Sequence, residues 1–95
     1  MHIRFEDDAR QDLRDIQEYL QPKNPAACER VLVSIFATID QLEKFPFLGR
    51  FGEVKDTREI SVTRYSYVIV YSIPDDFHID IERILHTSLE YPPSE

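Results

Sequence analysis

The sequence predicts an α+β fold in the order strand, helix, helix, strand, strand, strand (β-α-α-β-β-β). Two observations carry this prediction. Apolar residues recur at helical spacing through residues 8–45, with a proline-containing break at residues 21–24. From residue 58 onward the apolar residues instead alternate, as they do in strands. We therefore expect a small, mainly antiparallel sheet with a two-helix hairpin on one face.

The N-terminal segment predicts a short strand followed by the first helix. His2 to Phe5 alternates between polar and apolar residues. Asp7 is predicted to be the N-cap of a helix over residues 8–20, because short acidic side chains accept hydrogen bonds from the first helical N–H groups. The apolar stripe of this helix is Ala9, Leu13, Ile16 and Leu20.

The second helix is predicted over residues 25–45. Asn24 is a favourable N-cap, and Pro25 at the first helical position loses no N–H that the helix needs. The helix is expected to end before Pro46. Its apolar stripe contains Cys28, which we interpret as a small core residue, and Val31, Ile35, Ile39 and Leu42.

Residues 45–52 are predicted to form a loop that holds both glycines of the chain. Its phenylalanines, Phe45, Phe47 and Phe51, are expected to plug the end of the helix hairpin; the alternative is that they form part of a partner surface. Three strands are then predicted over residues 58–62, 67–73 and 77–85, with a turn at Pro74.

The predicted core combines the helix stripes with alternating strand residues, of which Val68, Val70, Ile79 and Ile81 should be buried. The 67–73 strand is apolar on both of its faces, so one face of the sheet has no covering element in this chain. We expect Tyr67 and Tyr71 to form part of a partner or ligand surface there. The alternative is that the sheet curls and loops cover this face.

Length and charge restrict the function. The 95 residues suffice for one domain, residues 1–95. With 11 Lys and Arg against 18 Asp and Glu, the net charge of −7 excludes a generically basic nucleic-acid binder. The most cationic stretch is residues 50–73, which has a net charge of +1 from four bases, Arg50, Lys55, Arg58 and Arg64, and three acids.

The sequence also predicts a location and an absence of cofactors. It contains no apolar run of membrane-spanning length and no apolar segment typical of a signal peptide, so we expect no membrane association. A single cysteine fits the reducing cytoplasm. The three scattered histidines and Cys28 show no metal-ligand spacing, so we expect neither a metal nor a cofactor.

Several motifs, taken in order, resemble the RelE/ParE superfamily of bacterial toxins. The first helix carries Ala9, Asp12, Leu13, Ile16, Tyr19 and Leu20 at the superfamily's spacing, and Asn24-Pro25-x-Ala27 opens the second. Ile39-x-x-Leu42-x-x-x-Pro46-x-x-Gly49-Arg50 follows. Thr57-Arg58-Glu59, Tyr67-x-Ile69-x-Tyr71, Ile84-Leu85-His86 and Tyr91-Pro92 complete the pattern.

This resemblance implies the strand–helix–helix–three-strand fold and a growth-inhibiting toxin of a type II toxin–antitoxin system, such as those that stabilise plasmids. It also implies a cognate antitoxin whose C-terminal segment wraps the toxin. RelE-like members cleave messenger RNA in the ribosomal A site, whereas ParE-like members poison DNA gyrase.

The residues favour the ParE-like branch. A metal-independent ribonuclease needs a base, an acid and cations for the phosphorane charge. Resemblance to RelE-like members implies basic residues on the central strands, but this chain has Ile60-Ser61-Val62 and Val68 there. We therefore favour no catalytic residue. The alternative is a ribonuclease that uses Arg83, His86 and Tyr91, and a third reading is a non-toxic interaction module.

The predicted partner-binding residues are Arg50, Arg58, Arg64, Tyr67 and Tyr71. For Arg50 two alternatives are open: it binds a partner's carboxylate or phosphate, or it pairs with Glu53 or Glu59 within the chain. Arg58-Glu59 is interpreted as a structural ion-pair site. Arg83 follows Ile79 and Ile81 in alternation, so it needs a carboxylate partner or lies at the rim. The carboxylates of the first helix, Asp8, Asp12 and Asp15, are expected to be solvated.

Overall fold

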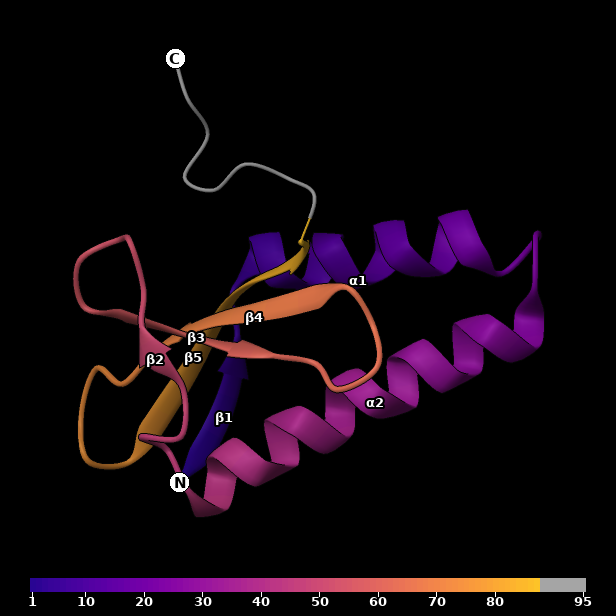
Figure 1. Cartoon of the computed structure of the whole chain (residues 1–95). Helices are drawn as coiled ribbons and strands as arrows, with labels where there is room; N and C mark the ends of the chain where they lie inside the picture. The colour runs from indigo at the N-terminus through magenta and orange to yellow at the C-terminus, as the bar shows by residue number, and fades with distance from the viewer. Residues whose placement is uncertain (88–95) are drawn as a thin grey trace.

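The structure, a computed structural model, describes residues 1–87. Two helices form a hairpin whose connecting turn extends beyond the sheet (Figure 1). The predicted order of elements is confirmed, with one additional short strand. The elements are β1 (His2–Phe5), α1 (Asp7–Leu20), α2 (Pro25–Lys44), β2 (Arg50–Phe51), β3 (Thr57–Ser61), β4 (Tyr67–Ser72) and β5 (His78–His86).

The five strands form one mixed sheet in the order β1-β5-β4-β3-β2. The three C-terminal strands form an antiparallel meander, and β1 adds to it in parallel beside β5, with Ile3 opposite Ile79 and Phe5 opposite Ile81. The N-terminal strand thus occupies an edge. Arg4 lies opposite Asp80 in this register and donates two hydrogen bonds to its carboxylate, at 2.7 and 3.2 Å.

Strand β2 was expected to be loop. It is only two residues long, and it pairs antiparallel with β3, so that Arg50 lies opposite Glu59 and Phe51 opposite Arg58. A segment this short carries no alternation of its own, and its pairing with β3 is a tertiary interaction. It forms the second edge of the sheet.

Of the two predicted helix N-caps, one is confirmed and one is wrong. Asn24 caps α2 through its Oδ1, which accepts the Ala27 N–H at 3.1 Å. The prediction of Asp7 as N-cap of α1 is wrong, because Asp7 is already helical and Glu6 precedes it without a side-chain cap. Asp7 and Asp8 instead place their charge in the first turn, where the helix dipole favours anions. Within residues 1–87, no helix has the length and apolar character needed to cross a membrane.

The core lies between the helices and one face of the sheet. The predicted helix residues are largely confirmed, with Ile16, Val31, Ile35, Ile39 and Leu42 buried, and Leu13 and Leu20 half-buried. Cys28 is also buried. On the sheet, Ile69, Tyr71, Ile79, Ile81 and Ile84 complete the cluster.

The face of β4 was predicted the wrong way round. Ile69 and Tyr71 point toward the helices, while Val68, which is half-buried, and Val70, which is buried, lie on the opposite face. Because both faces of this strand are apolar, its alternation could not decide between them. A register shift between Val70 and Tyr71 then makes Glu82 an extra residue on β5, since Val70 pairs with Arg83 and Tyr71 with Ile81.

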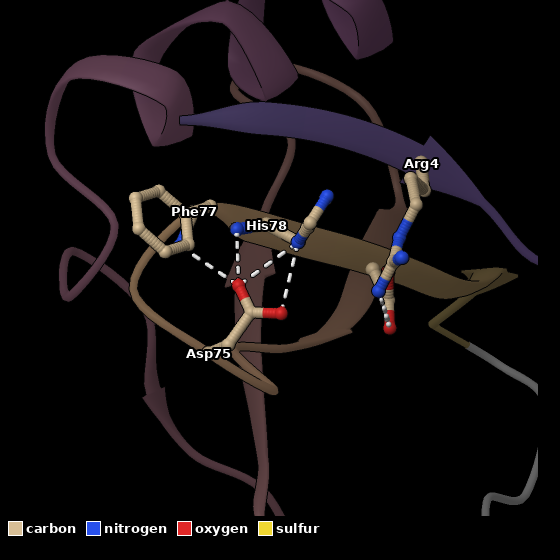
Figure 2. A network of polar contacts seen from close by, with 5 residues as sticks. Arg4, Asp75, Phe77 and His78 are labelled. Atoms are coloured by element: carbon tan, nitrogen blue, oxygen red, sulfur yellow. Dashed lines mark hydrogen bonds and ion pairs between the residues drawn. The ribbon is translucent and has the colours of Figure 1, made fainter.

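The turn before β5 is held by Asp75. Its Oδ1 accepts the backbone N–H groups of Phe77 and His78 at 2.8 and 2.9 Å, and the His78 Nδ1 lies 2.9 Å from both carboxylate oxygens (Figure 2). The hydrogen bond from the Phe77 N–H, followed by that with the His78 ring, lowers the pKa of the Asp75 carboxyl.

Candidate functional site

Strand alternation separates the predicted partner-binding arginines onto two faces of the sheet. Arg50 points to the face away from the helices together with Glu59, and its Nη2 lies 3.1 Å from the Glu59 carboxylate. Arg58 points to the opposite face, toward the loop that follows α2. The expected continuous surface from Arg50 to Arg64 is therefore two surfaces that meet at the β2 edge.

We call the sheet face away from the helices the open face. It carries a shallow hollow around the Arg50–Glu59 pair. Its floor comes from Val68, Val70 and Leu85, and its rim from polar residues of β3 and from the end of β5. Of the alternatives predicted for Arg50, the structure shows the intramolecular pair with Glu59. The lining residues are Arg50, Glu53, Glu59, Ser61, Val68, Val70, Leu85, His86 and Thr87.

Tyr71 does not lie on a partner surface, which corrects its prediction. The residue is fully buried, and its hydroxyl donates to the Pro46 carbonyl at 2.8 Å and accepts the Gly49 N–H at 2.9 Å. Burial raises the pKa of the Tyr71 hydroxyl above its ordinary value. A Cβ at position 49 would lie 2.6 Å from this hydroxyl, so the close approach requires glycine.

Arg58 is the second residue that fixes the loop after α2. Its Nη1 donates to the Gly49 carbonyl at 2.8 Å and to the Phe47 carbonyl at 3.4 Å. Its guanidinium carbon lies 4.4 Å from the ring centroid of Phe51 and 5.1 Å from that of Phe47. The prediction of Arg58-Glu59 as an ion-pair site is wrong, because alternation along β3 sends the two side chains to opposite faces. Arg58 binds the loop backbone and two rings, and Glu59 pairs with Arg50.

The phenylalanines of this loop do not plug the helix hairpin. Phe45, Phe47 and Phe51 are 63%, 68% and 81% exposed, and Leu48 beside them is 53% exposed. The buried side chain that reaches this loop is that of Tyr71, whose hydroxyl hydrogen-bonds the loop backbone at Pro46 and Gly49.

Arg64 and Tyr67 lie at the other end of the β3–β4 hairpin. Arg64 is exposed in the connecting turn and adopts a left-handed backbone conformation, with φ of 75°. Tyr67 is half-buried, and burial raises the pKa of its hydroxyl. Its ring meets that of His86 edge-on, with the centroids 5.3 Å apart.

The residues of the alternative catalytic set have different surroundings. Arg83 forms a bidentate ion pair with Asp12, from Nε at 2.8 Å and Nη2 at 3.0 Å. Of the two alternatives predicted for Arg83, a carboxylate partner or a place at the rim of the sheet face, the structure shows the carboxylate partner. The bulge at Glu82 shifts the alternation, so Arg83 does not follow Ile79 and Ile81 on the same face. His86 is exposed at the end of β5. Tyr91 lies outside the described residues.

Asp12 is not the solvated acid that was expected. Its side chain is 11% exposed, and besides Arg83 it accepts the backbone N–H of Ile84 at 2.8 Å. Pairing between β1 and β5 ends at Ile81, and beyond that point the Asp12 carboxylate accepts the backbone N–H of β5 in place of a strand partner. Asp15, one turn further along α1, instead accepts a hydrogen bond from Gln11 on the exposed surface.

Among residues 1–87, no three His, Cys, Asp or Glu side chains gather in a way that could hold a metal ion. The described surfaces offer ionic and apolar contacts. Arg50 and Glu59 supply charge on the open face, while Arg58 and the exposed rings supply a cation–π cluster at the β2 edge.

Comparison with known proteins identifies the family. The family model described as "ParE toxin of type II toxin-antitoxin system, parDE" matches residues 3–91. The chain belongs to the ParE toxin family. A curated relative from Sinorhizobium fredii, named "Putative toxin Y4kP", is 32% identical over 80 residues, which cover 84% of this chain and 81% of the relative.

The fold of this ParE-family chain also occurs in a solved structure titled "Chromosomal ParDE TA system from P. aeruginosa". The two chains superpose with a TM-score of 0.81 at 20% sequence identity, over 90% of this chain and 95% of the other. The match covers the helix hairpin and the sheet, so the predicted β-α-α-β-β-β architecture and the ParE-like branch are confirmed.

Proposed function

We propose that this ParE-family protein is the toxin of a type II toxin–antitoxin system, that it inhibits DNA gyrase, and that a cognate antitoxin neutralises it. The observation that carries the proposal is the match of the ParE toxin family to residues 3–91. The matching family and the similar solved structure are both described as parts of a toxin–antitoxin system. The antitoxin is sought in the product of the adjacent gene.

The side-chain geometry supports gyrase inhibition over RNA cleavage. Stabilising a phosphorane requires cations that are aimed at the reacting phosphate. The guanidinium of Arg83 is already bound by Asp12, and that of Arg50 is paired with Glu59. The net charge of −7 would in addition oppose entry into a site lined by ribosomal RNA phosphates.

One observation favours a second candidate, a RelE-like ribosome-dependent endoribonuclease. The open-face hollow brings Arg50, Glu59 and His86 around a single depression, and a carboxylate and an imidazole are the side chains that general acid–base catalysis uses. Under this alternative the partners are the ribosome and messenger RNA.

Induced expression in a bacterial host distinguishes the two candidates. Gyrase inhibition predicts filamentous cells, a DNA-damage response and loss of supercoiling by purified gyrase when the toxin is added. A ribonuclease predicts rapid arrest of translation and cleaved messages with supercoiling unaffected. Growth that continues unchanged at full expression of folded protein would support a non-toxic interaction module and contradict both candidates.

For neutralisation, we expect the antitoxin to use both surfaces that meet at the β2 edge. Arg50 on the open face and Arg58 and Arg64 beyond it would pair with antitoxin carboxylates, while Tyr67 offers apolar area. A segment that orders on binding must bury enough surface to offset its ordering, so we expect more than about 1,000 Å² of interface. Replacing Arg50, Arg58 and Arg64 together by Ser should slow association and reduce its dependence on salt.

A further inference from the structure

The segment after α2 exposes an unusual amount of apolar surface. We refer to Phe47, Phe51 and Arg58 together as the aromatic patch. The two rings are 68% and 81% exposed, and Phe45 and Leu48 extend the apolar area around them. Large apolar side chains that gather on a surface mark an interaction site more often than single exposed residues do.

The backbone beneath the aromatic patch is held in place by buried and half-buried groups. The Tyr71 hydroxyl joins the Pro46 carbonyl to the Gly49 N–H, and the Arg58 Nη1 binds the Gly49 carbonyl. Phe51 is also part of β2, which pairs with β3. The rings are therefore presented on a fixed backbone, and a fixed surface loses less conformational entropy on binding than a mobile one.

A hollow lies beside the rings and can receive a side chain of a partner. Its apolar walls are Phe47, Phe51, Val54, Ile73 and Pro74. The charged residues around it are Lys55 and Arg58 against Asp56 and Glu82, so the lining as a whole is neutral. The charge that lies against the rings themselves is the Arg58 guanidinium.

The position of this guanidinium determines what can cover the aromatic patch. An apolar partner surface would remove water from the Arg58 charge without replacing it, which costs free energy. A carboxylate from the partner would replace that water with a charge-assisted hydrogen bond. A second copy of this chain in a two-fold contact would instead bring two guanidinium groups together, so self-association through the patch is disfavoured.

We propose that the aromatic patch is a docking site for a segment of the cognate antitoxin that carries an apolar anchor side chain close to a carboxylate. The anchor enters the hollow between Phe47, Phe51 and Pro74, and the carboxylate binds Arg58. This inference rests on the proposed function, because the antitoxin is its occupant. It specifies the contact on the helix side of the β2 edge, where an apolar anchor joins the carboxylate already expected at Arg58.

The test compares two variants of the toxin in binding to the purified product of the adjacent gene. Phe47→Ala/Phe51→Ala removes both rings, and Phe77→Ala is the matched control, because Phe77 is 72% exposed but lies in the turn before β5. We expect the double variant to raise the Kd roughly 10–100-fold, mainly through faster dissociation, as is typical of hot-spot residues. The control should stay within about twofold. If the double variant melts more than a few degrees below the wild type, Phe51→Ala alone replaces it.

The charge component has its own measurement. Raising the NaCl concentration should weaken antitoxin binding by the wild type more than antitoxin binding by Arg58→Gln. Only the wild type pairs a guanidinium at this site with the antitoxin carboxylate, and salt screens that pair. Equal salt dependence of the two proteins would overturn the assignment of a carboxylate to this site.

The remaining outcomes separate this inference from the proposed function. Antitoxin binding by the wild type, with the double variant also within twofold, overturns the docking site and leaves the proposed function intact. Normal antitoxin binding with loss of growth inhibition assigns the aromatic patch to the toxin's target and equally overturns the inference. Failure of the wild type to bind the antitoxin contradicts the proposed neutralisation, and the docking site with it.

Discussion

Asp12 on α1 and Arg83 on β5 are joined by two hydrogen bonds, from Nε at 2.8 Å and from Nη2 at 3.0 Å. The same carboxylate accepts the Ile84 N–H, so one side chain both neutralises a guanidinium and takes the place of a strand partner. The pair connects the first helix to the last strand at the point where β1 no longer pairs with β5.

Asp12→Asn should destabilise the protein by about 1–3 kcal/mol, since hydrogen bonds to charged groups contribute about this much and Arg83 would lose its counter-charge. Denaturant unfolding measures the change. Asp15→Asn is the control, because its exposed hydrogen bond to Gln11 should contribute only a few tenths of a kcal/mol. Equal stability of both variants would show that water compensates for the ion pair.

Tyr71→Phe should cost about 1–3 kcal/mol, because it leaves the Gly49 N–H and the Pro46 carbonyl without their buried partner. The loop after α2 should also open more often, which hydrogen exchange at the Gly49 amide would detect. Tyr67→Phe serves as the control, since its half-buried ring lies edge-on to His86 at the other end of the β3–β4 hairpin, away from the loop after α2. Unchanged exchange at Gly49 in Tyr71→Phe would mean that Arg58 alone holds the loop.

Acid should destabilise the protein partly through Asp75. The folded-state pKa of this carboxyl lies below its ordinary value, so the unfolded state binds the proton more tightly. Its contribution is therefore complete above the ordinary pKa of an aspartate and is lost as the pH falls through the lower folded-state value. Asp75→Asn should flatten the fall in stability over this acidic window, measured by denaturant unfolding at a series of pH values. Asp76→Asn, in the same turn, should keep the wild-type slope, and a wild-type slope in Asp75→Asn would refute the assignment.

Replacement of His86 and Tyr91 together by Ala should leave growth inhibition largely intact, because we propose a toxin without a ribonuclease centre. Growth curves after induction, together with the integrity of cellular messages, provide the measurement. Phe77→Ala is a control for truncation of an exposed ring. If the wild type cleaves messages and the folded double variant does not, the ribonuclease alternative replaces gyrase inhibition.

Local patterns were sufficient for most of the fold. Helical spacing located α1 and α2 to within one residue at each end, and the Asn24-Pro25 start of α2 is confirmed. Alternation located β3, β4 and β5. These patterns involve residues close in sequence, because the side-chain periods of helices and strands set which residues share a buried face.

Interactions between distant segments could not be predicted in the same way. The face of β4 depends on how Ile69 and Tyr71 meet the helices, and both faces of that strand are equally apolar in sequence. The Asp12–Arg83 pair joins residues 71 positions apart. The exposure of Phe47 and Phe51 belongs to a loop whose backbone is bound by Tyr71 and Arg58 from distant strands, which no local pattern encodes.

The parallel pairing of β1 with β5 has a consequence for synthesis. Residues His2–Phe5 pair with residues 78–81, so the N-terminal strand must wait for nearly the whole chain to leave the ribosome before it joins the sheet. At ordinary elongation rates this delay is about 4–15 s, during which the apolar residues of β1 lack their partner strand. A binding partner already present in the cell would therefore encounter residues of α1 and α2 before β1 has joined the sheet.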